Sequence, residues 1–350
     1  MIEKIDVIGS DMNQVIELIH YCHDQGWSDG LPVIPPVEEL VNWMLTGTTR
    51  DPGEVICRIP PSWGEATIRR IAANAVMAGC LPEYMPVIIA ALQASVDDRF
   101  NLHGIQCTTH NCSPLVIVNG AIAKKLGMNS GHNCFGQGNR ANASIGRAVR
   151  LALVNIGGAR PGELDKATQG HPGKFTYCIA ENEEESPWEP YHVSRGFSPG
   201  ESAVTVFGAE APHNVNNQSS ENAHDLLMTI ADSLATLGSN NMYMMGECFI
   251  VLCPEHAKLI ADHGFSRRNT QEFIFNYGRR TIADLSRGGV YGMEINKNLW
   301  PRWVDIRNVD TLIPPVRRPE DIQIIVAGGT GRHSAVIPGW GTRCVTKPVL

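Results

Sequence analysis

After residue 100 the sequence alternates short apolar runs with longer segments of helical periodicity, and this alternation constrains the fold more than any other feature. Residues 115–118 and 248–252 are apolar runs bounded by turn residues, which is typical of buried strands. Residues 139–155 and 222–237 instead place apolar side chains at helical spacing. Strands that alternate with helices predict an α/β fold with a mainly parallel or mixed sheet.

The pattern of apolar residues divides the chain into three regions. Residues 1–100 are predicted to be mostly helical, and residues 101–313 to form the α/β core that holds the candidate active site. In residues 314–350, a strand at 322–327 and a glycine-rich loop are expected to pack on that core. The sequence shows no internal repeat of fixed period.

Charge and hydropathy narrow the classes of partner. The 36 acidic and 29 basic residues give a net charge of −7 without a basic run, which argues against binding nucleic acid through phosphate contacts. No apolar window of about 18 residues is present, and residues 1–10 lack the pattern of a signal peptide. We therefore expect a cytoplasmic protein with free thiols, a small-molecule substrate, no membrane partner and possibly a homo-oligomeric state.

Thiol and imidazole groups are dense between residues 103 and 134. Six occur in these 32 residues: His103, Cys107, His110, Cys112, His132 and Cys134. Such groups bind zinc, iron or copper, so His103, His110 and His132 are a candidate set of ligands for a divalent metal ion. Their spacing matches no standard zinc finger, which leaves the metal as one hypothesis among several.

A cysteine nucleophile is the rival interpretation of this segment. Cys112 follows His110 by two residues, so both side chains would point to one side of an extended chain. An imidazole there would hold the thiol as the reactive thiolate. The alternative is that Cys112 is a buried, inert thiol, because free cysteine is among the most buried residue types.

A glycine-rich loop that leads into a helix predicts an anion site. Gly136, Gly138 and Asn139 precede the predicted helix, whose first turn presents free N–H groups, and Arg140 would add a bidentate clamp. An ordinary turn with an N-cap is the other interpretation. Asn214, in an asparagine-rich segment, and Arg332, in a glycine-rich loop, are further candidates for substrate binding.

An acidic run follows the predicted strand at 175–180. Carboxylates at strand ends are common acid–base groups, which makes Glu181 and Glu184 catalytic candidates. A solvated face is the alternative for such a run.

Four segments resemble an uncharacterised bacterial family associated with UGSC-motif (seleno)proteins. They are residues 27–36, residues 119–120, residues 180–188 and residues 328–331. The resemblance covers most of the chain and implies a slight preference for thiol chemistry. The family has no activity that can be carried over to these residues, and this chain has no UGSC motif.

Together these patterns predict an enzyme that cleaves a bond in a small polar anion. We expect a hydrolase or lyase with a site centred on cysteine and histidine, with or without a metal ion. A thiol oxidoreductase, in which Cys107, Cys112 and Cys134 pass electrons to a partner protein, is the competing class. A binding subunit without catalytic activity is the third hypothesis.

Overall fold

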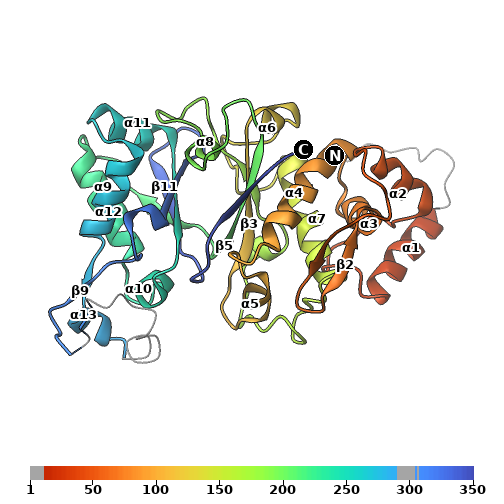
Figure 1. The fold of residues 1–350 in the computed structure, drawn as a ribbon, viewed down its shortest axis with the longest axis horizontal. Coiled ribbons are helices and arrows are strands. Elements are labelled where there is room, and N and C mark those ends of the chain that lie inside the picture. Colours follow the sequence, from red (N-terminus) through yellow and green to blue (C-terminus); the bar gives the residue numbers. More distant parts are fainter. Residues whose placement is uncertain (1–11, 290–303, 306) are drawn as a thin grey trace.

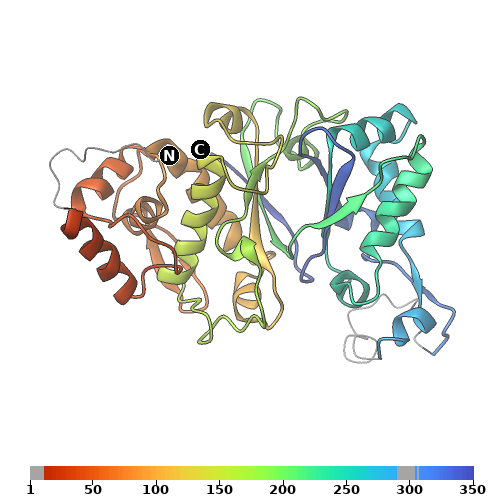
Figure 2. The same cartoon turned by 180° about the vertical axis from the view of Figure 1, so that it is seen from behind.

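The computed structural model describes residues 12–289, 304–305 and 307–350, and it arranges them in four layers (Figure 1). Two β-sheets stack face to face in the middle, and helices cover the outer face of each sheet. Figure 2 shows the same order of layers from behind. The α/β class predicted from the sequence is confirmed, and the sheets are mixed.

The first sheet has the strand order β12-β5-β3-β4. Its central strand β3 (Ser113–Asn119) pairs in parallel with β4 (Cys178–Ala180) and antiparallel with β5 (Ala203–Ala209). The last strand of the chain, β12 (Val345–Pro348), adds to β5 in antiparallel orientation. All seven residues of β3 are buried, as expected for a strand covered on both faces.

The second sheet has the order β10-β7-β11-β6 and the same pattern of directions. Its central strand β7 (Cys248–Leu252) pairs in parallel with β10 (Ile322–Val326) and antiparallel with β11 (His333–Ile337). The edge strand β6 (His213–Asn216) lies antiparallel to β11. Residues 314–350 therefore supply β10, β11 and β12, three strands built into both sheets, where the sequence predicted one strand packed on the core.

Aromatic side chains fill the space between the sheets. Phe207 of β5 and Phe249 of β7 are fully buried, with ring centroids 4.9 Å apart. Tyr191 packs on Phe249 at 5.6 Å and is 1% exposed. Alternation along each strand sends these residues inward and their neighbours outward toward the helices.

Helices α4 (Met85–Ser95) and α7 (Arg140–Asn155) cover the first sheet, and α3 (Ile68–Ala78) packs on these two helices. Outside them lie α1 (Met12–Asp24), α2 (Glu38–Leu45) and the antiparallel pair of β1 (Val55–Ile59) and β2 (Gly64–Thr67). The predicted helical region 1–100 thus joins the first sheet through α4.

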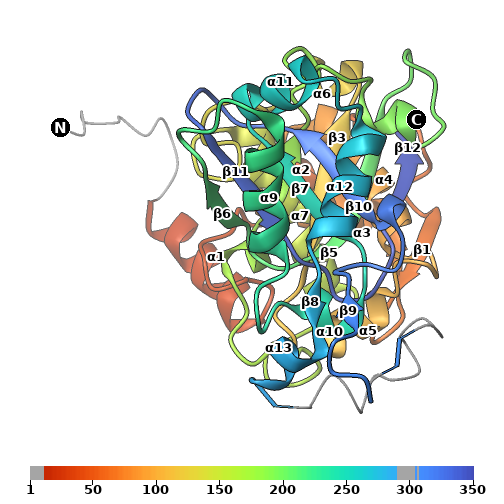
Figure 3. The same ribbon diagram turned by 90° about the vertical axis from the view of Figure 1, so that its left-hand side faces the viewer.

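Helices α9 (Ala223–Leu234), α11 (Pro254–Asp262) and α12 (Arg267–Tyr277) cover the second sheet, as seen in Figure 3. No helix among the described residues is both long and apolar enough to cross a membrane. The shorter elements are α5 (Leu102–Cys107), α6 (Ala121–Lys125), α8 (Tyr191–Ser194), α10 (Asn240–Met244), α13 (Ile282–Ser286), β8 (Arg280–Thr281), β9 (Leu312–Ile313), and the 3-10 turns Pro82–Tyr84, Pro172–Lys174 and Pro319–Asp321.

The order of elements repeats along the chain, although the sequence shows no repeat. Apart from α8 in the first series and β8, α13 and β9 in the second, the series α4, α5, β3, α6, α7, β4, β5, β6 is followed by α9, α10, β7, α11, α12, β10, β11, β12 in the same order and with the same strand directions. The final strand of each series is exchanged: β6 joins the sheet of the second series, and β12 joins the sheet of the first. An isolated antiparallel bridge between Ala209 and Gly339 links the two points of exchange.

Candidate functional site

The carboxyl ends of the parallel strands β3 and β4 bring two polar side chains together. Val118 pairs with Ala180, so the next residues, Asn119 and Glu181, are neighbours in register. Alternation places both on the inner face of the sheet. Helices α6 and α8 follow the two strands at this edge (Figure 1). The crevice at the carboxyl ends of parallel strands is where ligands bind in open α/β sheets.

Glu181 is a buried carboxyl group, 4% exposed. Its Oε2 accepts hydrogen bonds from Asn119 Nδ2 at 2.5 Å and from the Tyr191 backbone N–H at 2.7 Å. Its Oε1 accepts none and lies 3.8 Å from Arg267 Nη2. Burial raises the pKa of Glu181 to about 7, outweighing the Tyr191 hydrogen bond and the charge of Arg267, which lower it.

Unpartnered polar atoms concentrate around this carboxyl group. Within the described chain, nine buried side-chain nitrogen and oxygen atoms lack a hydrogen bond, and five of them are here. They are Glu181 Oε1, Asn119 Oδ1, Arg267 Nε and both ring nitrogens of His192. Because more than about 90% of buried polar groups are paired in folded proteins, such a concentration indicates a place suited to further hydrogen bonds. We call these four residues the Glu181 cluster.

A cavity of about 110 Å³ opens beside the cluster. Glu181, Glu183 and the backbone around Gly120 line it, together with Lys124 and Ser130. Glu183 Oε1 accepts hydrogen bonds from Asn119 Nδ2 at 2.9 Å and Gly120 N–H at 2.7 Å. His192 Nδ1 lies 3.8 Å from the same oxygen. Two carboxyl groups, an imidazole and a guanidinium thus meet at one edge of the sheet.

Glu184, the second predicted carboxylate, lines the cavity but is exposed. It pairs with Lys124, whose Nζ lies 2.6 Å from Glu184 Oε1. The sequence prediction found Glu181 but missed Asn119, His192 and Arg267. Asn119 carried a usable signal, since it ends a predicted strand just as Glu181 does.

Cys112 and His110 are adjacent, but they do not form the predicted nucleophile and base. His110 Nδ1 accepts a hydrogen bond from the Cys112 backbone N–H at 3.2 Å, and His110 Nε2 contacts Glu210 Oε1 at 2.7 Å. The Cys112 thiol points to the Ile105 carbonyl at 3.9 Å and is 1% exposed. Burial raises its pKa to about 12, so the geometry favours the inert interpretation.

The three candidate metal ligands do not come together. His103 and His110 lie near the start of β3. His132 instead lies beyond the carboxyl end of this strand, where the His132 ring packs against Gly329. The seven residues of β3 separate the two ends by about 20 Å. No group of three or more histidine, cysteine or acidic side chains among the described residues is placed to hold a metal ion. The structure therefore does not bring His103, His110 and His132 together as one set of ligands.

The predicted anion clamp has a structural role instead. Arg140 donates from Nε and Nη2 to the Gly79 carbonyl at 3.1 and 3.0 Å, which caps the end of α3. Asn139 is the N-cap of α7, with its Oδ1 accepting from the Asn142 N–H at 3.0 Å. Gly138 adopts a positive φ of 114° just before this cap.

Two of the residues predicted to bind substrate, Gly136 and Asn214, line the same second cavity. This cavity has a volume of about 250 Å³, and Cys134 and His333 also line it. His333 Nδ1 lies 3.0 Å from Asn214 Oδ1. Arg332 is turned away, with its Nη1 donating to the carbonyls of Gln218 and Ser220.

All ten cysteines are free, and their burial predicts an order of alkylation. We expect Cys107, which is partly exposed, to react with iodoacetamide well before Cys112 in the native protein at pH 7.5. Peptide mass spectrometry over time measures both rates, and in urea they should become similar. If Cys112 reacts as fast as Cys107 in the native protein, the nucleophile hypothesis regains its support.

Neither a family model nor a curated protein sequence matches this chain.

Proposed function

We propose that this protein is an enzyme that cleaves a bond in a small polar substrate by proton transfer at Glu181, as a hydrolase or a lyase. The observation that carries the proposal is a buried carboxyl group with a pKa of about 7 beside a cavity at the carboxyl ends of parallel strands. A general acid or base is most effective when its pKa lies near the working pH. Perturbed carboxyl groups in clefts are typical of active sites.

The hydrogen bonds assign different tasks to the two oxygens of Glu181. Oε2 already accepts from Asn119 and from the Tyr191 N–H, so it holds the carboxyl group in place. Oε1 is the oxygen left to carry the exchanging proton. Arg267, 3.8 Å from Oε1, stabilises the carboxylate after the proton leaves.

The cavity limits what the substrate can be. Its volume of about 110 Å³ suits a molecule of few atoms or the reacting end of a larger one. Lys124 is the cation among the lining residues, and its partner Glu184 is exposed. An anionic group on the substrate would therefore pair with Lys124 in place of Glu184.

A comparison of metabolite depletion by matched variants tests the proposal. Wild type, Glu181→Gln and Glu184→Gln are each incubated with a mixture of small bacterial metabolites, and loss of each compound is followed by mass spectrometry. We expect at least one small polar compound to be consumed by wild type and by Glu184→Gln, but at least about 100-fold more slowly by Glu181→Gln, the scale of general acid–base catalysis. Equal consumption by Glu181→Gln, or no consumption by any form, would overturn the proposal.

A further inference from the structure

Arg150 of α7 is a buried cation without a carboxylate in direct contact. It is 7% exposed, and no carboxylate oxygen of the described residues lies within 4.0 Å of its guanidinium nitrogens. Its side-chain partners are neutral: Ser113 Oγ at 2.9 Å and Gln106 Oε1 at 3.4 Å. A buried charge is costly unless it is paired, and arginine does not lose its proton in proteins.

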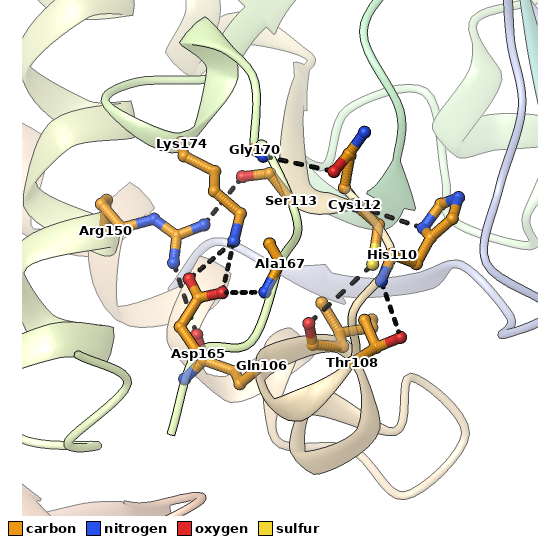
Figure 4. A network of polar contacts seen from close by, with 12 residues as sticks. Gln106, Thr108, His110, Cys112, Ser113, Arg150, Asp165, Ala167, Gly170 and Lys174 are labelled. Atoms are coloured by element: carbon orange, nitrogen blue, oxygen red, sulfur yellow. Dashed lines mark hydrogen bonds and ion pairs between the residues drawn. The ribbon is translucent and has the colours of Figure 1, made fainter. Parts of the chain in front are cut away.

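The nearby charges do not balance Arg150. Lys174 and Asp165 form an ion pair with each other at 2.6 Å, whereas the contacts drawn for Arg150 in Figure 4 go to Ser113 and Gln106. The only other charged residue lining the adjoining cavity, Asp29, is held by Arg147 through two contacts of 2.8 Å. Asp165 also attracts Arg150 through space, but Lys174 shares its single negative charge, so two cations face one carboxylate and one positive charge is left without an anion.

A cavity of about 180 Å³ adjoins this charge. Besides Arg150, Asp165 and Lys174, it is lined by Val154, Ala159, Pro161 and Phe175. The exposed residues Pro161 and Phe175 mark its opening to solvent. Most of the surface exposed in the cavity is apolar, although Ser28 and charged side chains of both signs also line it.

We propose that this cavity binds a small organic carboxylate, with its carboxylate on Arg150 and its apolar body against Val154, Ala159 and Phe175. The guanidinium supplies the missing ion pair through the fork geometry that suits a carboxylate. The apolar surface of the cavity favours an organic anion over inorganic phosphate, because phosphate has no apolar body to bury against it. The site lies at the amino end of β3, where Ser113 begins the strand, whereas the Glu181 cluster lies at its carboxyl end.

Calorimetric titration with defined probes tests the site. Benzoate and butyrate carry the proposed chemistry, benzyl alcohol keeps the apolar body without the charge, and phosphate keeps the charge without the body. We expect benzoate or butyrate to bind the wild type, and benzyl alcohol and phosphate to bind at least about tenfold more weakly, since a charge-assisted hydrogen bond changes affinity on that scale.

Variants separate this site from other arginines of the same helix. Arg150→Met should weaken benzoate at least about tenfold, while Arg140→Met, which changes an exposed arginine of α7, should not alter its affinity. Val154→Phe, which keeps the charge and fills the cavity, should also abolish binding and covers the case in which Arg150→Met does not fold. The proposal fails if neither carboxylate binds the wild type at millimolar concentration, if phosphate binds as tightly as benzoate, or if the folded Arg150 and Val154 variants bind as the wild type does.

Discussion

Phe249→Ala is expected to lower the free energy of unfolding by about 3–5 kcal/mol, the usual cost of removing a fully buried aromatic ring. Phe249 lies between the two sheets and packs against Phe207 and Tyr191. Its loss would leave a hole between two sheets that are each held by helices behind them, so the walls have little freedom to collapse. Urea denaturation followed by circular dichroism measures the change.

Phe175→Ala is the matched control, because this phenylalanine is 44% exposed. It should cost less than about 1 kcal/mol, as substitutions away from the core do. Equal losses at the two positions would contradict the stacking of the sheets through their aromatic faces.

Glu181→Gln is expected to remove a pH dependence of stability worth about 3 kcal/mol. The pKa of Glu181 is raised by burial from its ordinary value of 4.5 to about 7 in the folded chain. Between these values the folded protein keeps a proton that the unfolded chain has released, so rising pH favours unfolding. The stability of the wild type relative to Glu181→Gln should therefore fall as the pH rises from about 4.5 to about 7 and stay constant above.

The comparison uses the difference between two proteins, so groups that titrate alike in both cancel. The amide oxygen of glutamine can still accept from Asn119 and the Tyr191 N–H, which keeps the fold of this region. Glu184→Gln, at an exposed carboxylate, should track the wild type at every pH to within about 0.5 kcal/mol. A difference between wild type and Glu181→Gln that does not change with pH would show that Glu181 titrates like an ordinary carboxylate.

The elements with strong patterns were predictable, and the weakly patterned strands were not. The helix predicted over 139–155 is α7, and the strands predicted at 115–118 and 248–252 lie in β3 and β7. The edge strand β6 was missed because three of its four residues are exposed and it has no apolar run. Since β6 and β12 are the exchanged strands and neither has a strong sequence pattern, the exchange between the sheets was hidden from sequence reasoning.

The candidate site shows the same limit at the level of side chains. Glu181 was found because an acid after a strand is a local pattern, but Arg267 reaches it from 86 positions along the chain. Arg150 was missed because an arginine in a helix is normally exposed. Most residues of helix α7 are buried, and Arg150 is one of them. The helical spacing of apolar residues predicted one buried face and gave no sign that Arg150 would be buried too.

The exchange of β6 and β12 makes the two halves of the molecule obligate partners. Each half donates a strand across the bridge at Ala209 and Gly339 and receives one in return. Neither half can leave the other without exposing an unpaired edge on β5 or β11, and exposed edges attract other chains. The two series are thus arranged like the protomers of a domain-swapped dimer that share one polypeptide. Because each sheet needs a strand from the other half, we expect the two halves to unfold as one cooperative unit.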